Sequence, residues 1–191
     1  MRGDERGNNI GAVYSACAEP AVSGALAGQV GVVFVYGHGG SGKTSTLLGS
    51  GDGKGNPITS PSGVLQKACF ALMSSMSPKK LCVSVVEVYR EVAKDLLRQN
   101  GAALRLRDSG STTTVEGASE EHVASPSDLQ ALIEAVRPSV VGSKGHVVFT
   151  VRVGAGGRLF FVRLADTDLG STAKGAPPEQ VEARKVRCPA A

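Results

Sequence analysis

One octet carries the clearest chemistry in this sequence, and it reads GHGGSGKT from residue 37 to residue 44. Glycines allow backbone conformations that a Cβ would forbid, so several N–H groups can point at one phosphate. The lysine adds a positive charge for the β- and γ-phosphates, and the threonine offers a hydroxyl to Mg²⁺. The spacing G-x-x-x-x-G-K-[ST] therefore predicts a nucleotide-binding loop. Its residues are Gly37, His38, Gly39, Gly40, Ser41, Gly42, Lys43 and Thr44, with Thr44 also expected at the metal.

The context of the octet matches what a phosphate loop requires, which is a strand before it and a helix after it. Residues 30–36 are mostly β-branched or aromatic, and they predict a buried parallel strand that leads into the loop. Thr44 is expected to open the helix. A glycine-rich turn with a purely structural role is the alternative interpretation of the same residues.

Composition indicates a soluble globular protein of one domain. The chain has 191 residues, of which 41% are hydrophobic, and its net charge of +4 does not require a nucleic-acid partner. No apolar run reaches the roughly 18 residues of a membrane span, and the first residues lack the apolar core of a secretory signal. We therefore expect a cytoplasmic protein that is not bound to a membrane. The four cysteines and three histidines are scattered, which argues against a zinc site or a disulfide framework.

Strands alternate with helices around the octet, and this order predicts an α/β fold. The expected architecture is the layered sheet of P-loop NTPases with flanking helices and later antiparallel strands. A domain over residues 12–170 would follow a flexible start (1–11) and precede a disordered tail (171–191). The predicted helices are 12–27, interrupted or begun by Pro20, then 63–73 and 128–136, the last closed by Pro138. The predicted strands are 30–36, 81–89, 104–107 paired with 112–115, and the hairpin 146–153 with 158–165, while 49–62 is a surface loop and 90–98 is helical or a turn.

Two segments together resemble one family. FVYGHGGSGKT, which ends at Thr44, is similar to the FAYGQTGSGKT of kinesin motor domains, and VSVVEVYREVAKDLL, residues 83–97, is similar to their VSYLEIYNEEIRDLL. The order and distance of the two segments match the family, and the resemblance covers roughly residues 12–170. It implies ATP and Mg²⁺ as ligands, microtubules (tubulin) as partner, and a place on the cytoskeleton.

The two switch segments of a kinesin are altered in this chain. The first reads SSRSH in the family and GSKGH here, at residues 142–146, where Ser143 is the expected Mg²⁺ ligand that remains. The helix before it is expected to be nearly absent, because residues 136–141 leave little room. The second reads VDLAGSE in the family and VRLADTD here, so Arg163 replaces the aspartate and Asp166 replaces the glycine. A shifted register, with Asp166 or Asp168 at the metal and Gly170 at the phosphate, is the alternative.

These observations predict a kinesin-like, ATP-binding motor domain with impaired hydrolysis. A cation beside Mg²⁺ and an anion beside the γ-phosphate both oppose the chemistry of the family. A non-catalytic, kinesin-like scaffold is the first alternative, and an unrelated P-loop NTPase is the second. The sequence assigns no catalytic residue. The family's first strand and its later helices have no counterpart here, so we expect open sheet edges and marginal stability.

Overall fold

The computed structural model describes residues 10–49, 62–75, 81–98, 103–108, 110, 113–154 and 156–167. The predicted surface loop (49–62) and tail (171–191) fall almost wholly or wholly outside these ranges, as do Asp168 and Gly170 of the alternative switch register. Most of the predicted flexible start also lies outside them, although residues 10 and 11 are helical.

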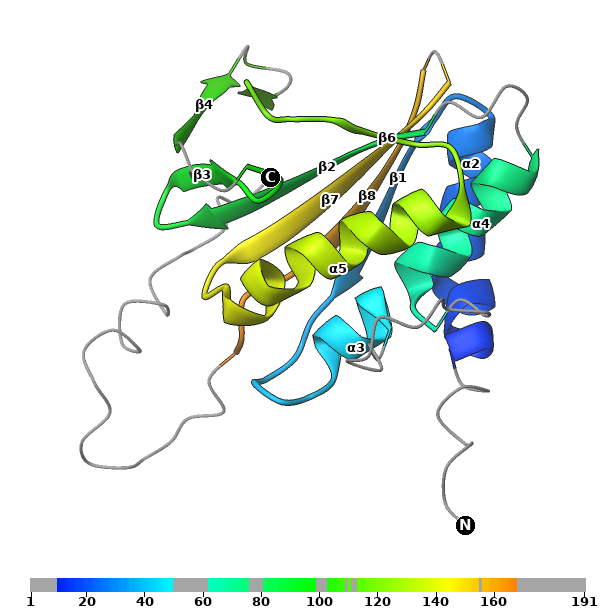
Figure 1. Cartoon of the computed structure of the whole chain (residues 1–191), viewed down its shortest axis with the longest axis horizontal. Helices are drawn as coiled ribbons and strands as arrows, with labels where there is room; N and C mark the ends of the chain where they lie inside the picture. The colour runs from blue at the N-terminus through cyan, green and yellow to red at the C-terminus, as the bar shows by residue number, and fades with distance from the viewer. Residues whose placement is uncertain are drawn as a thin grey trace.

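The described strands form one mixed sheet with the order β1-β8-β7-β2-β3-β4-β5, and β6 pairs with β2 (Figure 1). β1 and β8 are parallel, and the remaining pairs are antiparallel. The predicted α/β layer with antiparallel additions is therefore confirmed. The strands are β1 (Val30–Val35), β2 (Leu81–Tyr89), β3 (Val92–Asp95), β4 (Ala103–Asp108), β5 (Thr113–Glu116), β6 (Glu121–Val123), β7 (His146–Val153) and β8 (Gly157–Arg163).

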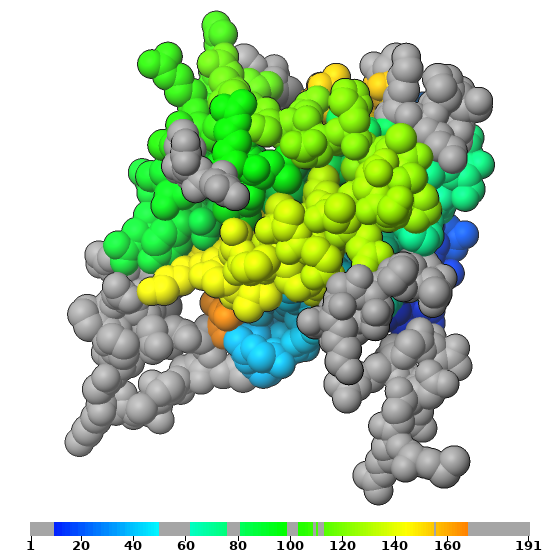
Figure 2. All heavy atoms as spheres, viewed as in Figure 1, coloured from blue at the N-terminus to red at the C-terminus, as the bar shows by residue number. Residues whose placement is uncertain are grey.

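The helices gather on one side of the sheet, and the core lies between the two layers (Figure 1). One row of the core crosses four paired strands, with Val33 beside Phe161, Phe161 beside Phe149 and Phe149 beside Val85. All four side chains are buried. Figure 2 shows α5 as a ridge across this side, with α3 below it. The helical elements are η1 (Tyr14–Ala18, a π-helix), α2 (Glu19–Leu26), α3 (Lys43–Leu48), α4 (Val64–Ser75) and α5 (Pro126–Gly142).

β1 is parallel as predicted, but the prediction that it is buried was wrong for one of its faces. It forms the end of the sheet and pairs only with β8 within the described chain. Val32 and Phe34 are 45% and 63% exposed, whereas Val33 between them is buried. The helices cover one face alone, so alternate side chains of this edge strand meet solvent.

The first helical segment runs through Pro20, so the proline interrupts the helix and does not begin it. η1 leads directly into α2, and Pro20 lies in the first turn of α2, where the hydrogen-bond pattern changes from the π-helix to the α-helix. Gly28 ends the helix with a φ of +83°. α2 packs closely on β1 and β8, and a Cβ on Gly157 would overlap the carbonyl oxygen of Ala25.

α5 corrects two expectations at once. It begins as predicted, with Ser125 and Asp128 forming a reciprocal capping box. It does not end before Pro138, however, but continues to Gly142, so the helix before the first switch is present. Pro138 lies on the exposed side, while Val136 and Val140 are buried on the other. Burial of that apolar face holds the helix together beyond the proline.

Residues 90–98 were predicted to be helical or a turn, and the helical prediction is wrong because β3 forms there. Arg90 and Glu91 make a two-residue turn with φ values of 48° and 65°, and Tyr89 pairs with Val92. Such turns favour Asn-Gly, so the sequence lacked the usual signal. The predicted hairpins of β4 with β5 and of β7 with β8 are confirmed.

Candidate functional site

The glycine-rich loop follows β1 and leads into α3, as the octet predicted. Gly40 and Gly42 have φ values of +76° and +91°, a region that favours glycine. Gly42 directly precedes α3, so this backbone conformation sets where the helix begins. The loop therefore has the strand, turn and helix arrangement in which backbone N–H groups can surround a phosphate.

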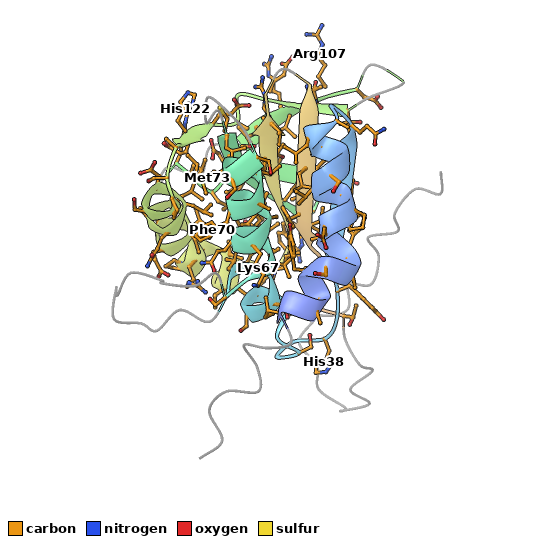
Figure 3. All side chains as sticks on the ribbon, turned by 90° about the vertical axis from the view of Figure 1, so that its right-hand side faces the viewer. His38, Lys67, Phe70, Met73, Arg107 and His122 are labelled. Atoms are coloured by element: carbon orange, nitrogen blue, oxygen red, sulfur yellow. The ribbon has the colours of Figure 1, made fainter. Side chains whose placement is uncertain are left out.

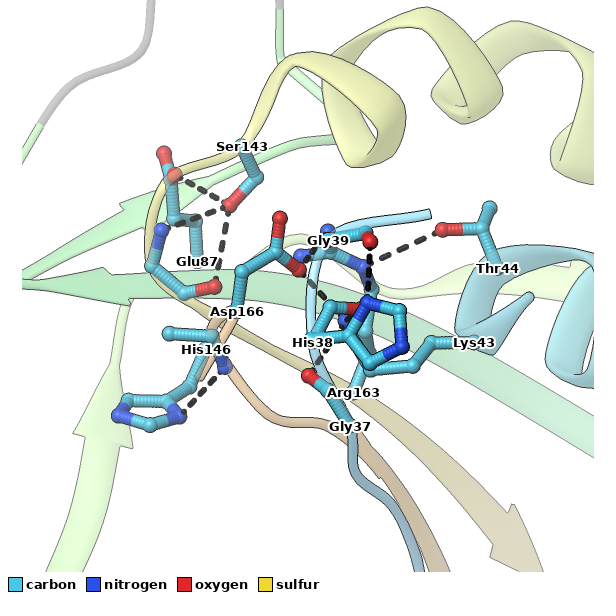
Figure 4. Close-up of polar contacts among 12 residues, drawn as sticks. Gly37, His38, Gly39, Lys43, Thr44, Glu87, Ser143, His146, Arg163 and Asp166 are labelled. Carbon is cyan, nitrogen blue, oxygen red and sulfur yellow. Dashed lines mark hydrogen bonds and ion pairs between the residues drawn. The ribbon is translucent and has the colours of Figure 1, made fainter. Parts of the chain in front are cut away.

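Lys43 is held inside the loop by three contacts (Figure 4). Its Nζ donates to the carbonyl oxygens of Gly37 and His38, both at 2.8 Å, and lies 2.6 Å from Oδ1 of Asp166. An ammonium group has three donors, and each of the three has a partner here. The residue is only 5% exposed. A phosphate that binds Lys43 must therefore compete with the Asp166 carboxylate.

The other predicted loop residues lie at the surface. The side chain of His38 is exposed, and its Nδ1 donates to the carbonyl oxygen of Gly39 at 2.6 Å. Ser41 is also exposed, and its backbone N–H closes the turn on the carbonyl oxygen of His38 at 3.2 Å. Both residues belong to the loop's own turn.

The segment after β8 runs beside the loop because β8 and β1 are parallel neighbours. Leu164 donates its N–H to Val35 at 3.0 Å, and Thr167 donates to the carbonyl oxygen of Gly37 at 3.2 Å. His38 and Thr167 form a parallel bridge. The second switch segment therefore lies directly against the phosphate loop, in the register that places Arg163 and Asp166 there.

Arg163 is a buried cation at the edge of the loop. Its Nε donates to Oγ1 of Thr44 at 3.2 Å, and its Nη2 lies 3.4 Å from Oδ1 of Asp166. The residue is 5% exposed, and its Nη1 is buried with no hydrogen-bond partner within the described structure. A buried guanidinium nitrogen without a partner is costly, which makes this group a candidate for ligand contact.

These side chains border a cavity of about 340 Å³, a size within the usual range for small-molecule sites. Two cations and one carboxylate face it, which favours a polyanion. It is lined by Gly40, Gly42, Lys43, Thr44, Ser45, Val141, Arg163 and Asp166.

Ser143 and Thr44 were both predicted at the metal, but their hydroxyl groups have different partners in the structure. Its Oγ donates to Oε1 of Glu87 at 2.5 Å and accepts from the N–H of Gly145 at 3.1 Å. Figure 4 shows the Ser143 and Glu87 pair as a group separate from the contacts of Thr44. The metal role of Ser143 remains a prediction, and the observed contact is a connection between α5 and β2.

His146 supports the same turn from the start of β7. Its Nδ1 accepts the N–H of Ala165 at 3.1 Å, so the ring is the neutral tautomer protonated at Nε2. Burial, and then the positive charge of Arg163, lower the pKa of His146 below its ordinary value. The residue is thus an uncharged acceptor that orients the chain next to Asp166.

Sequence reasoning missed two contacts of this site. The Lys43–Asp166 ion pair had a detectable signal, because Asp166 follows a strand parallel to the one before the loop. Arg137 had none. It reaches from α5 to donate to the carbonyl oxygens of Gly49 at 2.9 Å and Leu48 at 3.2 Å, and so caps the end of α3.

A larger cavity of about 610 Å³ lies between β3, β6 and α5. Two of the three acidic side chains among its described lining residues, Asp95 and Asp128, are already in use. Asp95 accepts the backbone N–H groups of Leu97 and Ser119, at 2.9 and 2.7 Å, and Asp128 caps α5. Figure 3 shows His122, which lines this cavity, far from His38 of the phosphate loop. The smaller cavity is therefore the stronger site candidate.

The resemblance to kinesin motor domains implies Mg²⁺ with the nucleotide, but the residues of this cavity do not fit the metal. Mg²⁺ requires oxygen ligands, and here Thr44 Oγ1 already accepts from a guanidinium. The single carboxylate among the lining residues, Asp166, is paired with Lys43 and Arg163. In the described ranges no three His, Cys, Asp or Glu side chains are grouped to hold a metal ion.

Comparison with known proteins identifies the class of this chain. The family model described as the kinesin motor domain matches residues 7–156. The chain therefore belongs to the kinesin motor domain family, a family of microtubule motors, and the resemblance carried by the phosphate loop and by residues 83–97 is confirmed.

Three curated relatives of the chain are longer kinesin-like proteins of plants. "Kinesin-like protein KIN-7D, chloroplastic" from Oryza sativa subsp. japonica is 36% identical over 152 residues, and "Kinesin-like protein KIN-7L, chloroplastic" from Arabidopsis thaliana is 34% identical over 152 residues. Each match covers 74% of this chain and 15% of the relative. "Kinesin-like protein KIN-7C, mitochondrial" from Arabidopsis thaliana is 34% identical, over 74% of this chain and 16% of the relative. The chain thus spans less than a fifth of these relatives. Within the described residues, no helix is long and apolar enough to span a membrane.

Proposed function

We propose that this chain is a kinesin-like domain that binds ATP through residues 37–44. The proposal rests chiefly on Lys43, a buried ammonium held by the carbonyl oxygens of its own loop beside a cavity suited to a polyanion. Arg163 adds a second positive charge to the cavity. The family's use of ATP supports the choice of nucleotide.

We further propose that hydrolysis is impaired. Arg163 stands at the position of the second-switch aspartate, and Asp166 stands at the position of the glycine. The Asp166 carboxylate competes with a γ-phosphate for Lys43. It is also the only carboxylate among the described residues lining the cavity, and both of its ion pairs would oppose a role as a base.

Association with microtubules, and with it a cytoskeletal location, is proposed from family membership. The alternative is a scaffold that keeps nucleotide binding without turnover, and the exchanged charges at Arg163 and Asp166 favour it. An unrelated P-loop NTPase is set aside because the chain belongs to the kinesin family. Sedimentation with microtubules tests association, and phosphate release with and without microtubules separates the motor from the scaffold.

The first experiment is a titration of the purified chain with a fluorescent ATP analogue, with Lys43→Ala as the test variant. We expect saturable micromolar binding that the substitution weakens by at least about 100-fold, because it removes the central cation of the loop. Lys94→Ala is the matched control, since Lys94 is an exposed lysine on β3, outside the cavity. Equal affinity of wild type and Lys43→Ala, or no binding by the folded wild type, would contradict the proposal.

A further inference from the structure

The contacts of Arg163 lead beyond nucleotide binding itself. We propose that this site binds the triphosphate of a nucleotide without Mg²⁺, and that the Arg163 guanidinium supplies the positive charge that the metal supplies in the family. The inference rests on the proposed function, because it concerns how the same cavity holds the phosphates. It also departs from the family, whose second switch carries an aspartate at this position.

Arg163 lies close to the loop threonine that was expected to bind the metal. Its Nε is 3.2 Å from Oγ1 of Thr44, and the hydroxyl oxygen accepts that hydrogen bond. The guanidinium therefore already occupies the hydroxyl oxygen through which Thr44 would hold a metal ion. Both residues line the same cavity as Lys43.

The guanidinium also has unused donors. It carries five N–H groups in a plane, and its contacts within the described structure go to Thr44 and Asp166. Its Nη1 is buried and has no hydrogen-bond partner there. Arg163 lines the cavity, so a small turn of the guanidinium would bring Nη1 to phosphate oxygens there. A planar fork suits a phosphate better than a single ammonium does.

The charges of the cavity agree with this arrangement. Lys43 and Arg163 together outweigh Asp166 by one positive charge, and His146 beside Arg163 is neutral. A bare triphosphate gains from both cations when it enters. A nucleotide that carries Mg²⁺ brings a dication next to a buried guanidinium, and this repulsion cancels part of the gain.

The test is a titration of the full chain with a fluorescent ATP analogue, first in EDTA and then in excess Mg²⁺. We expect the Kd in EDTA to equal the Kd in Mg²⁺ within about threefold or to be lower, because the charge-assisted hydrogen bonds of Arg163 replace those of the metal. A Kd at least about tenfold higher in EDTA would overturn the inference and leave nucleotide binding intact. Binding in neither condition would mean that the proposed function itself fails.

Substitutions of Arg163 give the test a second readout. Arg163→Asp restores the family's residue type, and we expect its binding to require Mg²⁺, with a loss of at least about tenfold in EDTA. Arg163→Lys keeps the charge and should keep metal-independent binding. Arg158→Asp is the matched control, because Arg158 is an exposed arginine at the other end of β8.

Circular dichroism and a thermal transition establish that each variant is folded. If Arg163→Asp does not fold, the affinities of Arg163→Lys and wild type, each measured in EDTA and in Mg²⁺, still test the inference. Metal-independent binding by both supports the inference. A requirement for Mg²⁺ that is the same in wild type, Arg163→Lys and any folded Arg163→Asp overturns it.

Discussion

The segments that follow β1 and β8 lie side by side, yet they differ in how much of the kinesin pattern they retain. After β1, all the glycines and Lys43 and Thr44 of the phosphate loop are present, with the backbone conformations that the loop requires. After β8, Arg163 and Asp166 stand where the proposed alignment expects an aspartate and a glycine, beyond the end of the family match at residue 156. The two segments still pair through backbone hydrogen bonds.

This difference indicates that phosphate binding and metal-dependent chemistry depend on separate parts of the molecule. The loop geometry comes from the backbone, from the pairing of β1 with β8, and from Arg137, which caps α3. The chemistry of the second switch depends on two side chains that can change without loss of the sheet. Under the proposed function, nucleotide binding persists where hydrolysis does not, and four predictions test this separation.

The largest effect is expected from Gly42→Val. A β-branched residue at a φ of +91° is strained, so the loop must leave its observed conformation. We expect nucleotide affinity to fall by at least about 100-fold, measured with the same fluorescent analogue. Gly110→Val is the control, because Gly110 has a similar φ of +83° in the β4–β5 turn. Figure 3 shows Arg107 of that hairpin at the opposite end of the molecule from His38. Unchanged nucleotide affinity in Gly42→Val would show that the loop does not bind the nucleotide.

A smaller effect in the opposite direction is expected from Asp166→Asn. The substitution removes the carboxylate that lies 2.6 Å from Lys43, and with it an anion that competes with phosphate. Affinity should rise by about fivefold, since Asp166 is half exposed and water screens the pair. Asp108→Asn, in the distant β4–β5 hairpin, should leave affinity unchanged. Weaker binding by Asp166→Asn would show that the carboxylate helps to hold the ligand.

Ser143→Ala separates a metal ligand from a structural contact. The hydroxyl donates to Glu87, so its removal should lower the free energy of unfolding by roughly 1 kcal/mol and change nucleotide affinity by less than about twofold. Urea unfolding and the fluorescent titration measure the two quantities. The exposed Ser139→Ala on the same helix is the control for stability. A loss of affinity seen only with Mg²⁺ would instead support the predicted metal role of Ser143.

The smallest effect concerns the pH dependence of stability at His146. Its pKa is lowered in the folded state, so the unfolded chain binds the proton more readily. The contribution of His146 is therefore complete above its ordinary pKa of about 6.5 and is lost as the pH falls below that value. His146→Asn retains an acceptor for the N–H of Ala165 and should unfold in urea with less difference between pH 7.5 and pH 5.5. The same pH dependence in both proteins would assign it to other groups.

Local sequence patterns predicted most of the fold. Alternating apolar residues revealed β2, β7 and β8, and Ser125 with Asp128 marked the start of α5. The errors have physical causes. Pro138 is tolerated because burial of one face of α5 outweighs a local breaking signal. The exposed face of β1 could not be predicted, because exposure depends on which elements cover a strand and not on the strand itself.

The site was predictable where its chemistry depends on contiguous residues. The octet predicted every residue of the loop. The resemblance to the family predicted that Arg163 and Asp166 stand in place of an aspartate and a glycine. Their contacts were not predictable, because the partners Lys43 and Thr44 lie about 120 residues earlier and meet them only through the pairing of β1 with β8. The partner of Ser143 was missed for a similar reason, since Glu87 lies on β2, 56 residues earlier in the chain.

The pairing of β1 with β8 also sets the order in which the molecule can be assembled. Val30 lies opposite Arg158, so nearly the whole described chain must be closed into a loop before these two strands meet. The hairpins β2 with β3 and β7 with β8 join residues that are close in sequence and can form early. During synthesis on the ribosome, the octet is therefore made before β8 and can reach its final neighbours only after β8 has been made. A chaperone that protects a nascent chain of this kind would encounter β1 with both of its edges unpaired.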